Sequence, residues 1–335
     1  MPNAYYADKI ESIRDIMGAR DVVLEDASLV VDGRAYPIVD DVIVLLDPAS
    51  YPDGLKRRLG ISTGDDPTGD VDEEVQYGFG AEWQRYSEIK PEYARVFDEY
   101  FDIVDMAALN GARVCDLGCG IGRWTYFLNQ KTVPREAILV DFSEAIFVAR
   151  HNLRDSHNSL FFMGDIENLP FRENFADFMY SIGVLHHIPT DCLDTVRGLK
   201  GYAPTILAYL YYALDNRPAY FRICLAVVTA VRKIVSRIHS PAFRELFTWL
   251  VASTVYAPLC YLGRMVKPFG LIRFIPLAGE HHYLNFRWWR LLVYDRFFTT
   301  VEQRVTRRQI MELKDTFSDV IVSPGPSYWH FLCKR

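Results

Sequence analysis

The feature that most restricts the fold of this chain is a short apolar stretch that ends in an acid and runs into closely spaced glycines. The stretch Val114–Asp116 leads to Gly118, Gly120 and Gly122, which occupy every second position before a helical pattern begins. Glycine lets the backbone turn tightly and approach a ligand where a Cβ atom would clash. The spacing differs from GxGxxG and from the phosphate loop GxxxxGK[ST]. It predicts a strand, a ligand-binding loop and a helix, with a purely structural turn as the alternative.

Short apolar runs alternate with amphipathic segments through the middle of the chain, which is typical of βαβ units and a parallel sheet. We expect strands near residues 112–116, 137–141, 160–163, 175–180 and 204–210. Polar residues follow the second, third and fourth runs, beginning at Asp141, Asp165 and Ser181. Because the carboxyl ends of parallel strands meet at one edge of a sheet, we expect these residues to line a single crevice.

The acids after the second and third runs suit an adenosine ligand. In doubly wound folds, an acid at the position of Asp141 accepts hydrogen bonds from both ribose hydroxyls. The adjacent Phe142 offers an aromatic face for stacking on adenine, and Asp165 can accept a hydrogen bond from the exocyclic amine. The alternative for Asp141 is a surface acid that caps the following helix.

Four motifs occur in order over residues 111–190, namely DLGCGIG, VDFS, GDIENLPF and YSIGVLHHIP. Together they resemble the class I S-adenosylmethionine (SAM) dependent methyltransferases. The resemblance implies an α/β fold with the Rossmann-like seven-stranded class I methyltransferase sheet, its last strand antiparallel, with a helical cap insertion and a small N-terminal β/α extension. The cofactor contacts that we expect are Trp83, Asp116, Gly118, Gly120, Gly122, Asp141, Phe142, Asp165, Ile166 and Ser181.

The resemblance also assigns roles to these positions. The three glycines flank the methionine part of SAM, Asp141 holds the ribose, and Asp165 with Ile166 frames the adenine. Trp83 resembles the aromatic residue that precedes the domain and closes over the cofactor. Since SAM carries a sulfonium cation, we expect a carboxylate from Asp116 and nearby aromatic rings to stabilise it.

The chain divides into four parts by composition and pattern. They are residues 1–76, an N-terminal extension with a degenerate zinc-ribbon-like β meander and a linker; 77–210, the SAM-binding core; 211–292, a helical, cationic and aromatic cap; and 293–335, C-terminal strands that complete the core sheet. The segment YPIVDDVIVLLDP at 36–48 resembles half of a small zinc ribbon but lacks its cysteines. We therefore expect no zinc there.

Methyl transfer is an in-line displacement whose rate comes largely from positioning, so few catalytic residues are required. His186 and His187 are candidates for a general base or for orienting the acceptor, with simple packing as the alternative. The prediction is a SAM-dependent transferase that methylates a small molecule in a capped hydrophobic pocket.

Two alternatives use the same pocket. In an azetidine-2-carboxylate synthase, the α-amine of SAM attacks its own γ-carbon and expels 5′-methylthioadenosine. This makes the protein a SAM-cyclising lyase of secondary metabolism, for which a dry site suffices. Tyr180 and Ser143 then contact the methionine chain. The third possibility is a protein that binds SAM without turnover.

The charge of the chain limits the classes of partner that we expect. The net charge of −6 argues against nucleic-acid binding, so a small-molecule substrate is expected. Residues 217–273 nevertheless hold nine Lys and Arg against one acid. Such a block can mark an anionic partner or a membrane surface, and a solvated helical layer is the alternative. Of these, peripheral membrane contact is not the expected one. The uncharged run Leu246–Leu262 predicts a buried or interfacial helix rather than a membrane span.

Six scattered cysteines form no CxxC pair and no cluster with zinc-ligand spacing, so we expect no metal. Scattered cysteines and an N-terminus without a signal-peptide pattern predict a cytoplasmic protein. The oligomeric state and the acceptor stay open.

Overall fold

The computed structural model of the protein describes residues 3–61, 87–238, 240–299, 301–325 and 329–335. It divides the chain into two compact units. The first unit comprises Met1–Tyr211 and Arg307–Arg335, and the second comprises Tyr212–Thr306. Trp83 lies outside the described residues.

The first unit is built on a sheet whose central strands are β5 (Arg113–Leu117), β6 (Glu136–Asp141), β7 (Ser159–Met163), β8 (Phe178–Ile182) and β9 (Thr205–Tyr209). These five strands pair in parallel in the order β7-β6-β5-β8-β9. All residues of β5, β7 and β8 are buried. Both faces of the sheet are therefore covered, as parallel sheets require.

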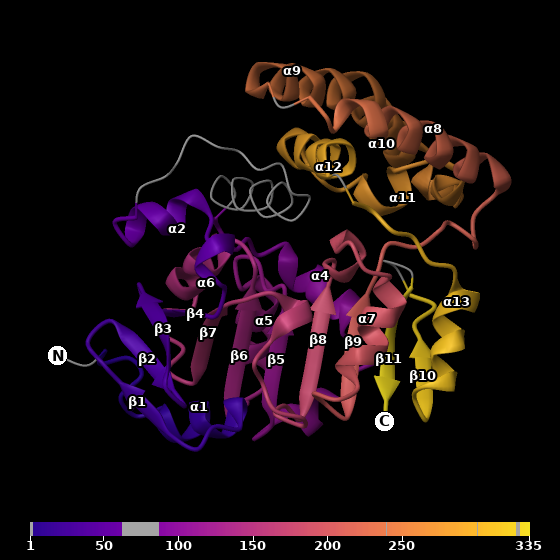
Figure 1. The fold of residues 1–335 in the computed structure, drawn as a ribbon. Coiled ribbons are helices and arrows are strands. Elements are labelled where there is room, and N and C mark those ends of the chain that lie inside the picture. Colours follow the sequence, from indigo (N-terminus) through magenta and orange to yellow (C-terminus); the bar gives the residue numbers. More distant parts are fainter. Residues whose placement is uncertain (1–2, 62–86, 239, 300, 326–328) are drawn as a thin grey trace. The chain divides into compact units, whose positions relative to one another are not determined.

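Two strands from the C-terminal part complete this sheet (Figure 1). The strand β11 (His330–Lys334) lies between β9 and β10 (Asp319–Val322) and is antiparallel to both. The strand order β7-β6-β5-β8-β9-β11-β10 has one antiparallel member, the last strand in the chain. The expected seven-stranded Rossmann-like sheet is confirmed.

Helices along the first unit connect and cover these strands. They are α4 (Tyr93–Tyr100), η2 (Met106–Leu109), α5 (Arg123–Lys131), α6 (Ala145–Asn152), η3 (Ile166–Asn168), η4 (Leu185–His187), α7 (Cys192–Leu199), α13 (Arg307–Met311) and η8 (Glu312–Asp315). The helix α5 buries Trp124, Phe127 and Leu128. This buried face fixes the start of α5 beside the end of β5.

The N-terminal extension is continuous with this sheet and does not form a separate domain. It contains α1 (Ile10–Met17), β1 (Val22–Leu24), β2 (Ser28–Val31), β3 (Arg34–Val39), β4 (Val42–Val44), η1 (Pro48–Ser50) and α2 (Asp53–Arg58). The strand β4 pairs in parallel with β7, which gives one sheet of eleven strands. The hydroxyl of the fully buried Tyr6 donates to the Asp41 carbonyl at 2.7 Å and lies 3.3 Å from the Phe161 carbonyl. The boundary that we expected near residue 76 therefore does not separate the meander from the core.

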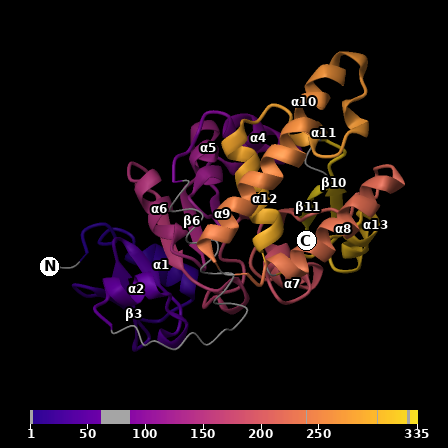
Figure 2. The ribbon, with the colours of Figure 1, turned by 90° about the horizontal axis from the view of Figure 1, so that it is seen from above.

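The second unit is helical. It consists of α8 (Ala219–Val235), α9 (Pro241–Val251), the π-helical turn η5 (Ala252–Tyr256), α10 (Ala257–Val266), η6 (Lys267–Phe269), η7 (Ile272–Phe274), α11 (Ala278–His281) and α12 (Phe286–Phe298). The helices α9 and α12 lie side by side (Figure 2). The core of the unit forms around Tyr256, Trp289 and Val293, with residues from α8, α9, η5, α10 and α12. The expected boundary between residues 292 and 293 falls inside α12. Because Val293, Phe297 and Phe298 pack into this core, α12 stays in the helical unit.

Candidate functional site

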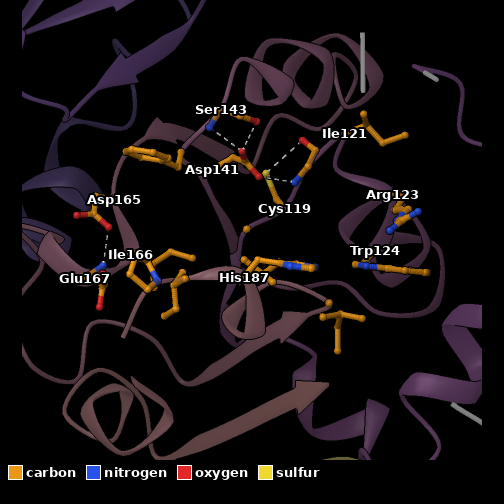
Figure 3. Close-up of a pocket in the computed structure, with 18 residues that line it drawn as sticks. Cys119, Ile121, Arg123, Trp124, Asp141, Ser143, Asp165, Ile166, Glu167 and His187 are labelled. Carbon is orange, nitrogen blue, oxygen red and sulfur yellow. Dashed lines mark hydrogen bonds between the residues drawn. The ribbon is translucent and has the colours of Figure 1, made fainter. Parts of the chain in front are cut away.

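A cavity opens at the carboxyl ends of β5, β6, β7 and β8, and its lining residues all belong to the first unit (Figure 3). The lining comes from the loops that follow these strands. It comprises Gly118, Cys119, Gly120, Ile121, Arg123, Trp124, Asp141, Phe142, Ser143, Asp165, Ile166, Glu167, Ile182, Gly183, Val184, His187, Ile188 and Pro189. The structure therefore brings together polar residues from four successive loops.

The glycine loop after β5 forms one wall of the cavity. Gly118, Gly120 and Gly122 have φ values of 74°, 54° and 75°, in the left-handed region that favours glycine. A Cβ atom on Gly118 would lie 2.5 Å from the Val184 side chain. Gly122 precedes α5 and does not line the cavity, and a Cβ atom there would lie 3.1 Å from the Cβ of Ala149 on α6. Gly122 therefore allows α5 and α6 to pack, whereas Gly118 and Gly120 face the cavity.

Asp141 holds this loop against the end of β6. One carboxylate oxygen accepts the backbone N–H of Gly120 at 2.7 Å, and the other accepts the N–H and the hydroxyl of Ser143 at 2.8 and 2.7 Å. Burial raises the pKa of Asp141, and the hydrogen bonds from Ser143 and Gly120 oppose that rise. The carboxylate is fixed in place while it lines the cavity.

Asp165 is fixed in a similar way after β7. Its carboxylate accepts the N–H of Glu167 at 2.9 Å and the side-chain amide of Asn168 at 2.6 Å, which caps η3. Phe142 and Ile166 add apolar surface to the lining. In Figure 3, Asp165 and Ile166 lie on one side of the cavity, and Arg123 and Trp124 lie on the other.

Asp116 and Tyr180 do not line the cavity. Both are fully buried, and Thr125 of α5 joins them. The Thr125 hydroxyl donates to an Asp116 oxygen at 2.9 Å and lies 2.7 Å from the Tyr180 hydroxyl. Burial raises the pKa of Asp116 to about 7, although hydrogen bonds from Thr125 and Tyr180 oppose the rise. The structure thus places these two predicted site residues in the core beside α5.

The two histidines after β8 differ in position. His187 is buried and lines the cavity, whereas His186 does not. The His186 Nδ1 accepts the backbone N–H of Tyr211 at 3.4 Å, and its ring stacks on that tyrosine at 3.9 Å between centroids. Ser181 also lies outside the lining, and its hydroxyl donates to the Leu117 carbonyl at 2.9 Å. His186 and Ser181 therefore support the loops, and His187 reaches the cavity.

Several lining residues were not predicted from the sequence, and three of them, Arg123, Glu167 and Cys119, carry ionisable groups. The Arg123 guanidinium lies 4.5 Å from the Trp124 ring centroid and 5.1 Å from that of Tyr93. Its place directly after the glycine loop is the signal that would have identified it. Burial raises the pKa of the Cys119 thiol well above its ordinary value, so this cysteine stays protonated. Among the described residues, no three His, Cys, Asp or Glu side chains cluster as metal ligands.

Residues 114–200 match a family model described as a methyltransferase domain. Together with the strand order and the glycine loop, this match supports the resemblance of this part of the chain to the class I SAM-dependent methyltransferases. Over 159 residues, the chain is 28% identical to a demethylmenaquinone methyltransferase of Staphylococcus saprophyticus. That match covers 46% of this chain and 67% of the relative.

Two solved structures that match part of this chain come from Mesorhizobium loti and Pyrococcus horikoshii. The first is a SAM-dependent methyltransferase with 23% identity and a TM-score of 0.29, and the match covers 33% of this chain and 51% of that one. The second is the PH0226 protein, with 24% identity and a TM-score of 0.33. The match covers 39% of this chain and 64% of that one. This chain thus spans less than two thirds of the length of either structure.

Proposed function

We propose that this protein transfers the methyl group of SAM to a small-molecule acceptor, and that the cavity at the strand ends holds the SAM. The observation that carries the proposal is Asp141, which anchors the glycine loop and also lines the cavity. In the proposed complex Asp141 accepts the ribose hydroxyls, and Asp165 with Ile166 contacts the adenine. SAM supplies an electrophilic methyl carbon on a sulfonium.

Two further lining residues have roles in the proposal. The guanidinium of Arg123 lies on the side of the cavity away from Asp165, where it suits the methionine carboxylate because arginine binds carboxylates through paired N–H groups. His187 is the imidazole in the cavity lining, and it accepts the proton that a hydroxyl or amine acceptor releases.

The acceptor is proposed to be apolar or anionic. Ile182, Val184 and Ile188 give the cavity an apolar wall beside His187, which supports an acceptor with a hydrophobic body. The helical unit is proposed to act as the substrate cap, and its excess of Lys and Arg suits an anionic group. All six cysteines are free thiols, which supports the proposal that the enzyme works in the reducing cytoplasm.

Replacement of Asp141 by alanine tests the binding site. We expect the Kd for SAM, measured by isothermal titration calorimetry, to rise about 10- to 100-fold, because hydrogen bonds to a charged group are lost. Asp155→Ala is the matched control, since Asp155 is an exposed acid of the same unit. Asp141→Asn keeps the shape of the side chain and controls for folding. An unchanged Kd in both Asp141 variants would place SAM elsewhere.

The nucleoside product identifies the reaction. We expect S-adenosylhomocysteine only when an acceptor from a small-molecule panel is present. Methylthioadenosine from SAM alone would support intramolecular cyclisation instead. The two residues named for cyclisation already form hydrogen bonds within the protein. Ser143 bonds to Asp141, and Tyr180 bonds to Thr125. Tight SAM binding with no product under any condition would indicate a SAM-binding protein without turnover.

A further inference from the structure

The second unit exposes an unusual amount of apolar surface. Of the 21 exposed large hydrophobic side chains among the described residues, 17 belong to Tyr212–Thr306. On α8 they form a stripe of Tyr220, Ile223, Val227, Val231 and Ile234, which recur every three or four residues along one face. Ile223 is 65% exposed and Ile234 is 70% exposed. Amphipathic helices of globular proteins turn such a stripe toward the core, but the other described helices of this unit leave the stripe uncovered.

The long helix Pro241–Phe269 has a second exposed face. Thr248, Ala252, Tyr256 and Cys260 recur every four residues on its buried side, and this side packs toward α12. The other side exposes Leu246, Trp249, Leu250, Leu262, Met265 and Phe269. Only 28% of the most apolar stretch of this helix is buried.

The packing of this helix suits a position along a bilayer surface better than a position across a bilayer. It is long and apolar enough to cross a membrane. However, Glu245 near its start pairs with Arg290 of α12. A crossing helix would carry α12 and these charges toward the hydrocarbon, where charged side chains are costly. A helix with one apolar face and a partner on the other face suits the interface plane.

The charge of the helical unit indicates which kind of surface these two apolar faces suit. The unit holds 13 Lys and Arg against 5 Asp and Glu in sequence. Among its described side chains, Arg222, Lys233 and Arg237 are exposed near the α8 stripe and form no ion pair with another described residue. Each cation near an anionic membrane contributes about 1 kcal/mol. A second copy of this unit would bring two cationic faces together, so self-association is disfavoured.

We propose that the outer faces of α8 and of helix Pro241–Phe269 bind the surface of an anionic phospholipid bilayer, with both helices in the interface plane. The exposed apolar side chains enter the boundary between headgroups and acyl chains, and Arg222, Lys233 and Arg237 contact lipid phosphates. This places the helical unit at a membrane without a spanning segment.

Vesicle flotation of the whole protein without SAM tests this proposal. We expect the protein to float with vesicles of phosphatidylcholine and phosphatidylglycerol in equal parts, and to stay in solution with phosphatidylcholine alone. The double variant Lys233→Glu/Arg237→Glu removes two cations and should weaken binding at least about 30-fold. The double variant Ile223→Glu/Val227→Glu should abolish flotation. Val133→Glu adds a charge at a 77% exposed apolar position of the first unit and should bind as the wild type does.

The fluorescence of Trp249 gives a second measurement. A vesicle-dependent blue shift should be absent in Trp249→Phe, because Trp249 lies on the exposed face. The proposal is overturned if wild-type protein floats with neither vesicle, or if Val133→Glu binds as weakly as Ile223→Glu/Val227→Glu. It is also overturned if light scattering shows a dimer that Ile223→Glu/Val227→Glu dissociates. Since SAM is absent throughout, failure here leaves the methyl-transfer proposal unaffected.

Discussion

Asp116 and Asp141 end neighbouring parallel strands, yet their surroundings give them different chemistry. Asp141 receives three hydrogen bonds, including two from backbone N–H groups, which favour its ionised form. One Asp116 oxygen accepts from Thr125, and the other has no hydrogen-bond partner among the described residues. Burial raises the pKa of Asp116 to about 7. Burial also raises the pKa of Asp141, but its hydrogen bonds oppose that rise.

The raised pKa of Asp116 predicts a specific pH dependence of stability. In the folded state this pKa is about 7, against an ordinary value of 3.8, so the native protein holds the proton more tightly than the unfolded chain does. This stabilisation is complete below the ordinary value and is lost as the pH rises through about 7. Asp116→Asn has no such loss. Its free energy of unfolding relative to wild type should rise over this range, by at most about 4 kcal/mol.

Urea unfolding at several pH values, from the ordinary pKa of the carboxyl to above its folded pKa, measures this difference. Asp141→Asn is the comparison variant. The hydrogen bonds to the Asp141 carboxyl oppose the effect of burial on its pKa. The stability difference between Asp141→Asn and wild type should therefore change less with pH. If the stability difference between Asp116→Asn and wild type were constant with pH, the carboxyl would not titrate in this range.

Sequence motifs predicted the part of the site that lies in the loops. The motif positions Gly118, Gly120, Asp141 and Asp165 all line the cavity, because a backbone turn after a strand fixes their location. Thr125 was not predicted, since its position beside Asp116 depends on how α5 packs onto the sheet. The sequence around Thr125 does not indicate its contact with Asp116.

At the scale of elements, the buried side chain of Arg113 fastens the N-terminal extension to the sheet through an ion pair with Asp15. The Arg113 guanidinium at the start of β5 bonds Asp15 of α1 and Glu136 of β6, each at 2.5 Å, and donates to the Phe175 carbonyl at 3.1 Å. Only 7% of the Arg113 side chain is exposed. One side chain therefore links α1, β5 and β6.

Arg113→Met should lower the free energy of unfolding by about 3–5 kcal/mol, because it leaves the largely buried Glu136 without its charged partner. Chemical denaturation measures the change. Arg14→Met is the matched control, since Arg14 pairs with the exposed Glu11 on the surface of α1 and should cost no more than about 1 kcal/mol. Equal losses in the two variants would contradict a structural role for the buried network.

The periodicity of apolar residues predicted the strands of the sheet. It did not predict which elements pack against one another. The strand β4 is only three residues long, and its pairing with β7 depends on an open sheet edge that no local pattern reveals. In the same way, composition placed a boundary inside α12, because the burial of Val293 and Phe297 depends on contacts with distant helices.

At the scale of the whole molecule, the helical unit is an insertion whose two ends meet. Tyr212 and Val305 form a parallel bridge, and the N–H of Ala213 donates to the Val305 carbonyl at 2.8 Å. The chain leaves the sheet after β9 and returns before α13. The sheet therefore needs only a short connection at this point.

Replacement of residues 214–304 by a short glycine-serine linker should leave the first unit folded. Because the cavity lining belongs entirely to that unit, we expect the Kd for SAM to stay within about tenfold of the full chain, as measured by calorimetry. Vesicle binding should disappear. A folded first unit, shown by cooperative thermal unfolding, that no longer binds SAM would mean that the helices complete the cofactor site.

The pairing of β4 with β7 also bears on how this protein meets others. An open strand edge in a sheet is a template on which another chain can add a strand. Here the position beside β7 is occupied by the protein's own β4, and the sheet continues outward to the three-residue strand β1. A partner that binds by adding a strand would therefore find the place beside β7 already occupied.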